Sequence, residues 1–116
     1  MNLAKKLNLK EGMKVHVVAR PAGVDLDDVP IASSPKADAI LVFVKKLADV
    51  DAKCGPAIEA AKADHLSWIA YPKAGQLGTD LNRDILWRYL LKHGIQGVRQ
   101  VPIDDVWSAM RFRPTK

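Results

Sequence analysis

The stretch AILVFV, residues 39–44, decides the fold class. It has the length of a strand, and its unbroken apolar character is typical of a strand buried on both faces of a parallel sheet. From Leu47 to Ala61 the apolar residues instead recur at helical spacing, and Gly55-Pro56 predicts that this helix is kinked or divided in two. A buried strand followed by a helix of this length is typical of the α/β class.

Four further runs predict strands on either side of this unit. They are short, rich in β-branched and aromatic residues, and lie at residues 15–19, 65–71, 98–103 and 106–112. Because only Asp104-Asp105 separates the last two runs, that pair must be antiparallel if the two strands are neighbours. The irregular segment 24–38 predicts one helical turn after Val24 and a minimal strand at Ile31-Ala32.

Helical spacing also occurs at residues 2–7 and at residues 81–92, where Thr79 or Asp80 is the expected N-cap. The alternation of strands and helices predicts an α/β fold of the Rossmann-like, three-layer α/β/α type. We expect a mostly parallel sheet of about five to six strands with a C-terminal antiparallel hairpin. One domain should span residues 1–116, since folded domains commonly have roughly 100–150 residues.

The composition is that of a globular protein with a mild excess of positive charge. The chain has 116 residues and a formal net charge of +5, with the charges spread evenly over both halves. Its single cysteine, Cys54, excludes an internal disulfide, and no apolar run approaches the roughly 20 residues that cross a bilayer. The first residues lack the long apolar core of a secretory signal. We therefore expect a cytoplasmic protein without membrane association.

Several segments carry a resemblance to a known fold: LSWIAYPK (66–73), DLNRDILWRYLLKHGI (80–95), GVRQVPI (97–103) and WSAMRFR (107–113). Their succession resembles the C-terminal half of a class I methyltransferase-like Rossmann fold. The chain is similar, more closely, to small stand-alone bacterial proteins of unknown function, which share the YPK strand end, the DLNRD segment and a WSALRFRP-like last strand. Because that family has no established activity, the resemblance implies a fold but no catalytic residue.

The turn after the first strand departs from true methyltransferases. Their Gly-rich turn lets the backbone approach S-adenosylmethionine, but here residues 19–23 read ARPAG, and Arg20 and Pro21 would crowd that position. The acidic residue that holds the ribose in that family has no clear counterpart. We therefore expect neither S-adenosylmethionine nor any other cofactor.

Cationic residues follow three of the predicted strands. Arg20, Lys45 and Lys73 stand at or just beyond the carboxyl ends, which share one edge of a parallel sheet, and ligands of open α/β sheets bind there. Thr79 and Asn82 stand near the start of the next helix, whose free N–H groups favour an anion. We expect these five residues to bind a phosphate or carboxylate. The alternative is that the cations are solvated and neutralised by nearby aspartates.

Tryptophans near arginines suggest a protein interface. Trp87, Arg99, Trp107 and Arg111 form the candidate set, because a partly exposed tryptophan flanked by arginine is common at interface hot spots. The alternative is that the tryptophans cover sheet edges within the monomer. The strand at 106–112 could also pair with a second copy of itself in a homodimer.

The remaining reactive side chains predict no catalytic residue and no metal site. The three histidines lack metal-ligand spacing, and Ser67 and Ser108 lie within strands rather than on an exposed turn.

We therefore expect a non-catalytic domain that binds a partner or a small anionic ligand. A small enzyme acting on a phosphorylated or carboxylated substrate at the strand edge is the alternative. Nucleic-acid binding through Arg99, Arg111 and Arg113 is a weaker alternative.

Overall fold

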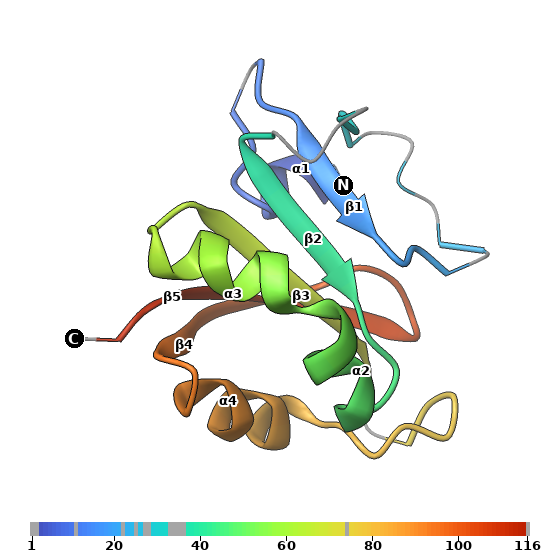
Figure 1. Ribbon diagram of the computed structural model, residues 1–116. Coiled ribbons are helices and arrows are strands. Elements are labelled where there is room, and N and C mark those ends of the chain that lie inside the picture. The colour runs from blue at the N-terminus through green and yellow to red at the C-terminus, as the bar shows by residue number, and fades with distance from the viewer. Residues whose placement is uncertain are drawn as a thin grey trace.

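A computed structural model describes residues 3–10, 12–21, 23–24, 26, 29–32, 37–73 and 75–115. Its helices are α1 (Leu3–Lys6), α2 (Leu47–Lys53), α3 (Gly55–Lys62) and α4 (Arg83–Leu91). Its strands are β1 (Val15–Val18), β2 (Ala39–Phe43), β3 (Leu66–Pro72), β4 (Ile95–Pro102) and β5 (Trp107–Pro114), as Figure 1 shows.

The strands form one five-stranded sheet in the order β1-β2-β3-β5-β4. β1, β2 and β3 pair in parallel, whereas β5 is antiparallel to both β3 and β4. Two of the four neighbouring pairs are therefore antiparallel, and the expectation of a mostly parallel, Rossmann-like sheet is wrong. The reason lies in the short turn after β4, which sends β5 straight back so that it inserts between β3 and β4. The antiparallel C-terminal hairpin itself is present.

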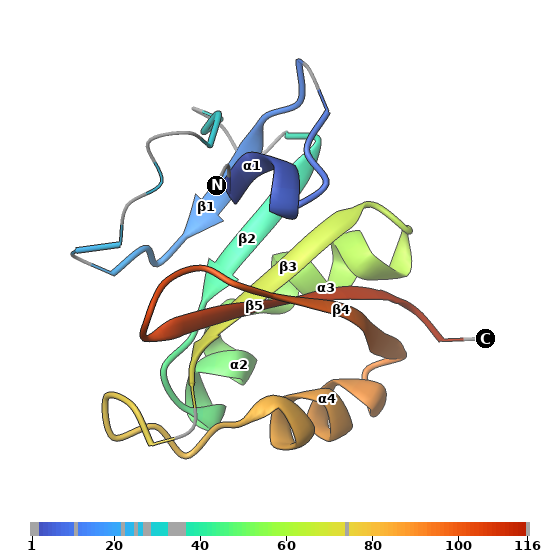
Figure 2. The ribbon, with the colours of Figure 1, turned by 180° about the vertical axis from the view of Figure 1, so that it is seen from behind.

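The two faces of the sheet are covered unequally. α2, α3 and α4 pack on one face, and among the described helices only α1 packs on the other (Figures 1 and 2). Irregular chain completes the second face, where Val24, Leu26 and Val29 are buried with Trp68. A four-residue helix does not form a layer, so the expected three-layer α/β/α arrangement is corrected to one helical layer on a mixed sheet.

The helical stretch after β2 is divided at Cys54, as predicted. Pro56 stands in the first turn of α3, where its missing N–H removes no helical hydrogen bond. The N–H of Cys54 still donates to the Val50 carbonyl oxygen at 3.0 Å, and its thiol is fully buried. Burial raises the pKa of the Cys54 thiol to about 12, so this side chain is a core residue.

β5 is an interior strand of the sheet. It pairs with β3 from Ser67–Phe112 to Pro72–Trp107 and with β4 along its other edge. Because both of its edges are hydrogen-bonded within the chain, this strand cannot pair with a second copy, and that expectation is wrong. β4 forms one border of the sheet, and a shift of register between Gly97 and Arg99 marks a bulge in it.

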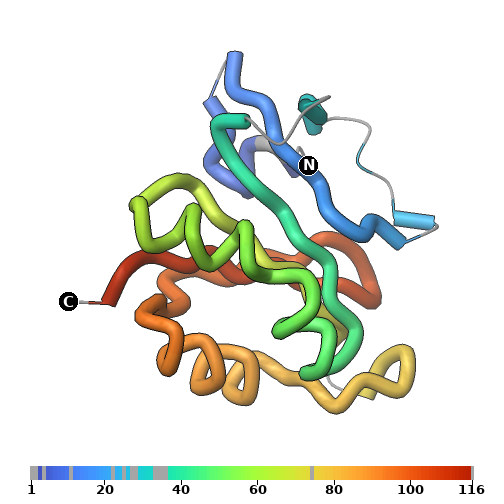
Figure 3. Tube along the Cα trace, viewed as in Figure 1, coloured from blue at the N-terminus to red at the C-terminus, as the bar shows by residue number. Residues whose placement is uncertain are grey.

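In its described parts, the connection from β1 to β2 is irregular chain that lies at the β1 border of the sheet (Figure 3). Val15 receives a hydrogen bond from Ala32 and donates one to the Pro30 carbonyl, at 2.7 and 2.8 Å. The resulting parallel bridge from Val15 to Ile31 confirms the minimal strand expected there. The helical turn expected after Val24 lies partly outside the described residues. No helix among them is long and apolar enough to cross a membrane.

Candidate functional site

Three of the cations singled out in the sequence lie at one edge of the sheet. Because β1, β2 and β3 are parallel and aligned, Arg20, Lys45 and Lys73 follow their carboxyl ends on the same side. Arg20 and Lys45 are exposed, and neither side chain makes an ion pair with another described residue. Lys73 differs, because its Nζ donates to the carbonyl oxygen of Asp104 at 2.8 Å.

The loop before α4 is fastened to the start of α2. The Thr79 hydroxyl donates to the Lys45 carbonyl oxygen, and the Leu47 N–H donates to Asp80 Oδ1 at 2.9 Å. Thr79 therefore has a structural role, as does Asp80. The Thr79 hydroxyl oxygen also accepts a hydrogen bond from the Leu81 N–H at 3.0 Å. The expectation that Thr79 or Asp80 caps the following helix is nevertheless wrong, because that helix begins at Arg83 and its N-cap is Asn82.

Asn82 is the N-cap of α4. Its Oδ1 accepts a hydrogen bond from the Ile85 N–H at 2.9 Å, and the helix begins at Arg83 rather than at Leu81. This cap satisfies one of the N–H groups that a helix leaves free in its first turn. The Asn82 amide also lies in the wall of a pocket, so the residue has a second use beyond capping.

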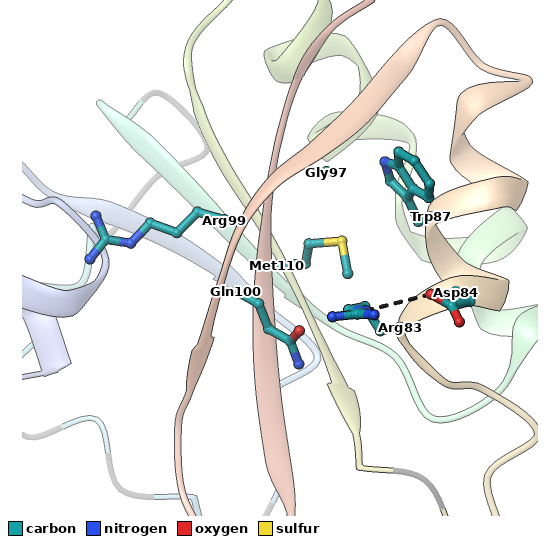
Figure 4. A pocket seen from close by; sticks show the side chains of 7 residues that line it. All are labelled: Arg83, Asp84, Trp87, Gly97, Arg99, Gln100 and Met110. Carbon is teal, nitrogen blue, oxygen red and sulfur yellow. Dashed lines mark ion pairs between the residues drawn. The ribbon is translucent and has the colours of Figure 1, made fainter.

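Two adjoining pockets form a groove between α4 and the β4–β5 hairpin, here called the α4 groove, and Figure 4 shows the side chains that line the smaller of them. The pockets measure about 420 and about 290 Å³ and share Arg83, Asp84 and Gln100. The larger end is polar and is lined in addition by Tyr71, Lys73, Asn82 and Ser108. The smaller end is lined by Trp87, Gly97, Arg99 and Met110, and Figure 4 shows Arg99 extending away from the groove. A polar end beside an aromatic wall is typical of small-molecule sites.

Tyr71 supplies the least satisfied group of the groove. The residue is 2% exposed, and its hydroxyl has no hydrogen-bond partner among the described residues. Ser108, which lies directly opposite Tyr71 in the β3–β5 pairing, is also buried. Burial raises the pKa of Tyr71 to about 12, while the nearby Arg83 opposes this rise and Asp84 adds to it. The Tyr71 hydroxyl thus stays protonated at neutral pH and is available as a donor.

The charge around the polar end is positive by one unit. Lys73 and Arg83 contribute two positive charges, and Asp84 contributes one negative charge. Arg83 Nε and Asp84 Oδ1 are 3.5 Å apart, and both side chains are well exposed. An exposed pair of this kind is weak, so Arg83 can exchange its partner for a ligand at little cost.

The four residues proposed for an interface do not form one surface. Trp87 is 38% exposed and lines the α4 groove. Trp107 is 4% exposed and packs edge-on against Phe43 with ring centroids 5.3 Å apart, so it belongs to the core and its expected interface role is wrong. Arg99 and Arg111 pair with each other on the opposite face of the sheet.

The structure brings together only Lys73 and Asn82 of the expected anion site, while Arg20, Lys45 and Thr79 do not line the α4 groove. Sequence reasoning missed Tyr71, Ser108 and Gln100 as site residues. The sequence feature that could have indicated these residues is the predicted antiparallel hairpin at the C-terminus. An antiparallel β5 beside β3 places a polar residue of one strand opposite the end of the other, but only once that pairing is known.

A further pocket, of about 330 Å³, lies at the opposite edge of the sheet and contains two histidines. His16 and His65, expected to lie apart, line it together with Asp38. Across the described part of the chain, no three His, Cys, Asp or Glu side chains are placed to hold a metal ion. This pocket therefore adds no metal centre to the description.

Comparison with known proteins gives no family assignment: no protein-family model and no curated protein matches the chain.

Proposed function

We propose that this protein is a non-catalytic binding domain for a small molecule that carries a phosphate or carboxylate group, and that the ligand occupies the α4 groove. The observation that carries the proposal is the buried Tyr71 hydroxyl: it has no hydrogen-bond partner in the described part of the chain, and Tyr71 lines the polar end of the groove together with Arg83. A buried hydroxyl without a hydrogen bond costs roughly 1–3 kcal/mol, which a ligand oxygen would recover.

The surroundings of this hydroxyl support an anionic ligand. Lys73 and Arg83 provide cationic donors, and Asn82 and Gln100 provide amide groups within the same groove. The groove also follows the carboxyl end of β3, which is where ligands of open α/β sheets bind. Asp84 faces the ligand too, so we expect the ligand to displace its contact with Arg83 or to offer it a donor.

The first experiment is a thermal-shift series at low salt with inorganic phosphate, ribose 5-phosphate, AMP and citrate. A ligand at 100 times its dissociation constant adds about 2.7 kcal/mol of stability. For a domain of this size we expect a rise in melting temperature of roughly 10 °C or more. If none of these compounds raises the melting temperature, the proposal is rejected. Chemical change of a bound compound would instead support the small enzyme considered above.

Two variants test whether the ligand binds in the α4 groove. We expect Lys73→Ala to weaken binding about tenfold or more, because it removes a charged donor. Lys45→Ala is the matched control, since it removes the same charge from the same edge but outside the groove. Equal losses in the two variants would show that the affinity comes from general charge and not from the α4 groove.

Tyr71→Phe separates binding from folding. The variant removes a hydroxyl that has no partner, so we expect unchanged or slightly higher stability in the free protein. Affinity for the best compound of the series should fall about fivefold to tenfold. A loss of stability together with unchanged affinity would contradict a binding role for this hydroxyl.

A further inference from the structure

Two arginines lie side by side on the sheet face opposite α4. Arg99 of β4 pairs directly with Arg111 of β5 in the antiparallel register. Like charges in directly opposite positions destabilise a sheet, so such a pair calls for a compensating contact. Arg99 has a compensating contact with a neutral group, because its Nη1 donates a hydrogen bond to Asn8 Oδ1 at 3.1 Å.

Arg111 has no such contact. Its Nε is buried without a hydrogen-bond partner, and its guanidinium makes no ion pair with the described residues. Asp64 interacts electrostatically with Arg111, but its carboxylate is already engaged by Arg113 through two hydrogen bonds of 2.9 and 3.0 Å. The charge of Arg111 therefore remains available to a group from outside the protein.

Arg111 lines a pocket of about 570 Å³, here called the Arg111 pocket. Its other walls are Asn8, Leu9, Lys10, Met13 and Leu66. The segment after α1 is held over this face because Trp68 Nε1 donates to the Leu7 carbonyl oxygen at 3.1 Å (Figure 2). The pocket thus combines an apolar wall with two cations, and no acidic residue is among the described residues that line it.

We propose that the Arg111 pocket binds a small organic anion, in which a carboxylate or phosphate contacts Arg111 and Lys10 and an apolar body packs on Leu9, Met13 and Leu66. Charge complementarity selects the anionic group, because the unpaired guanidinium can form a two-pronged contact with it. The apolar wall favours a ligand whose uncharged part is apolar. This site lies on the opposite face of the sheet from the α4 groove and does not depend on the function proposed for that groove.

The test uses naphthalene-2-carboxylate as the probe and its neutral carboxamide as the matched compound. Each is titrated into the ¹⁵N-labelled full chain and followed by NMR. We expect the carboxylate to shift the backbone amide signals of residues 8–13, 66 and 111, and the carboxamide to bind at least about tenfold more weakly. Equal affinity for the two compounds would overturn the proposal, because it would show an apolar pocket without anion selection.

Variants test the role of the guanidinium. Arg111→Gln should weaken binding of the carboxylate about tenfold or more, and Lys10→Gln should weaken it less. Arg88→Gln is the matched control, since Arg88 is an exposed arginine on α4, away from this pocket. Melting temperatures verify that each variant is folded, and Lys10→Gln, at an exposed position, keeps the test valid if Arg111→Gln does not fold. Shifts confined to Trp87 and its neighbours would place the probe in the α4 groove and overturn the second site.

Discussion

Gly97 lies where β4 passes beneath the side chains of Trp87 and Met110. A Cβ atom built on this glycine would lie 2.4 Å from Met110 Sδ and 3.0 Å from Trp87 Cδ1. The first distance is shorter than real Cβ contacts and the second is tighter than most of them, so the absence of a side chain at Gly97 lets Met110 and the indole close over the strand. The apolar end of the α4 groove depends on this close approach.

We expect Gly97→Ala to lower the free energy of unfolding by about 1–3 kcal/mol, because the added methyl group must displace two packed side chains. The measurement is urea denaturation followed by tryptophan fluorescence. Gly55→Ala is the control: its Cβ would meet nothing within 4 Å, and it lies in the first turn of α3. That control should be neutral or slightly stabilising. Similar losses in both variants would show that the contacts around Gly97 do not matter.

At the scale of the element, α4 shows how a helix start can depend on distant contacts. The sequence predicts Thr79 or Asp80 as the cap, whereas the cap in the structure is Asn82, which is an equally suitable residue. Thr79 and Asp80 instead bind the backbone at the start of α2, and Thr79 also accepts a hydrogen bond from the Leu81 N–H. The helix starts after Asn82, so these long-range hydrogen bonds position the segment that leads into the groove wall.

Replacing Asn82 tests this cap and the groove together. Asn82→Ala should lower the free energy of unfolding by about 1 kcal/mol, which is roughly 5 °C in melting temperature. Asn82→Asp should retain the stability, because aspartate caps helices as well as asparagine does. We expect the same Asp variant to bind anions more weakly, since it places a second carboxylate in the groove beside Asp84. Loss of stability in Asn82→Asp would argue against the capping contact.

The helices and strands could be predicted from local sequence, but the order in which the strands pair in the sheet could not. The unbroken run at 39–44 and the division of the following helix at Cys54 depend on residues close in the chain. The insertion of β5 between β3 and β4 depends on pairing between segments far apart. Tyr71 became a site residue only through this pairing, because Ser108 and the start of α4 complete its surroundings. Of the five residues predicted for an anion site, only Lys73 and Asn82 line the proposed groove.

At the scale of the whole molecule, the end of β5 is tied to the turn that joins α3 to β3. Arg113 donates two hydrogen bonds to the carboxylate of Asp64, which adopts a left-handed backbone conformation with φ 60°. The guanidinium of Arg113 lowers the pKa of Asp64 below its ordinary value of 3.8. Since the folded state holds the charged carboxylate, this contact stabilises the protein above the ordinary pKa and is lost as the pH falls through the lowered one.

We expect Asp64→Asn to lower the melting temperature by a few degrees at neutral pH and to have no effect near pH 2. The difference between the two proteins should shrink as the pH falls below about 4. Melting curves recorded across this range provide the measurement. Asp105→Asn serves as the control, because Asp105 is exposed and makes no ion pair within the described chain. A difference that persists unchanged at pH 2 would show that the Asp64 variant acts through the strained turn and not through charge.

The bulge in β4 also bears on how copies of this protein behave when crowded together. A straight border strand presents a row of free backbone groups, which invites other chains to add to the sheet and begin fibril growth. In β4 the irregular register between Gly97 and Arg99 and the proline at 102 interrupt that row. At the other border, the bridge from Ile31 occupies part of β1. Both borders of the sheet are thus partly blocked against the strand-by-strand addition of other chains.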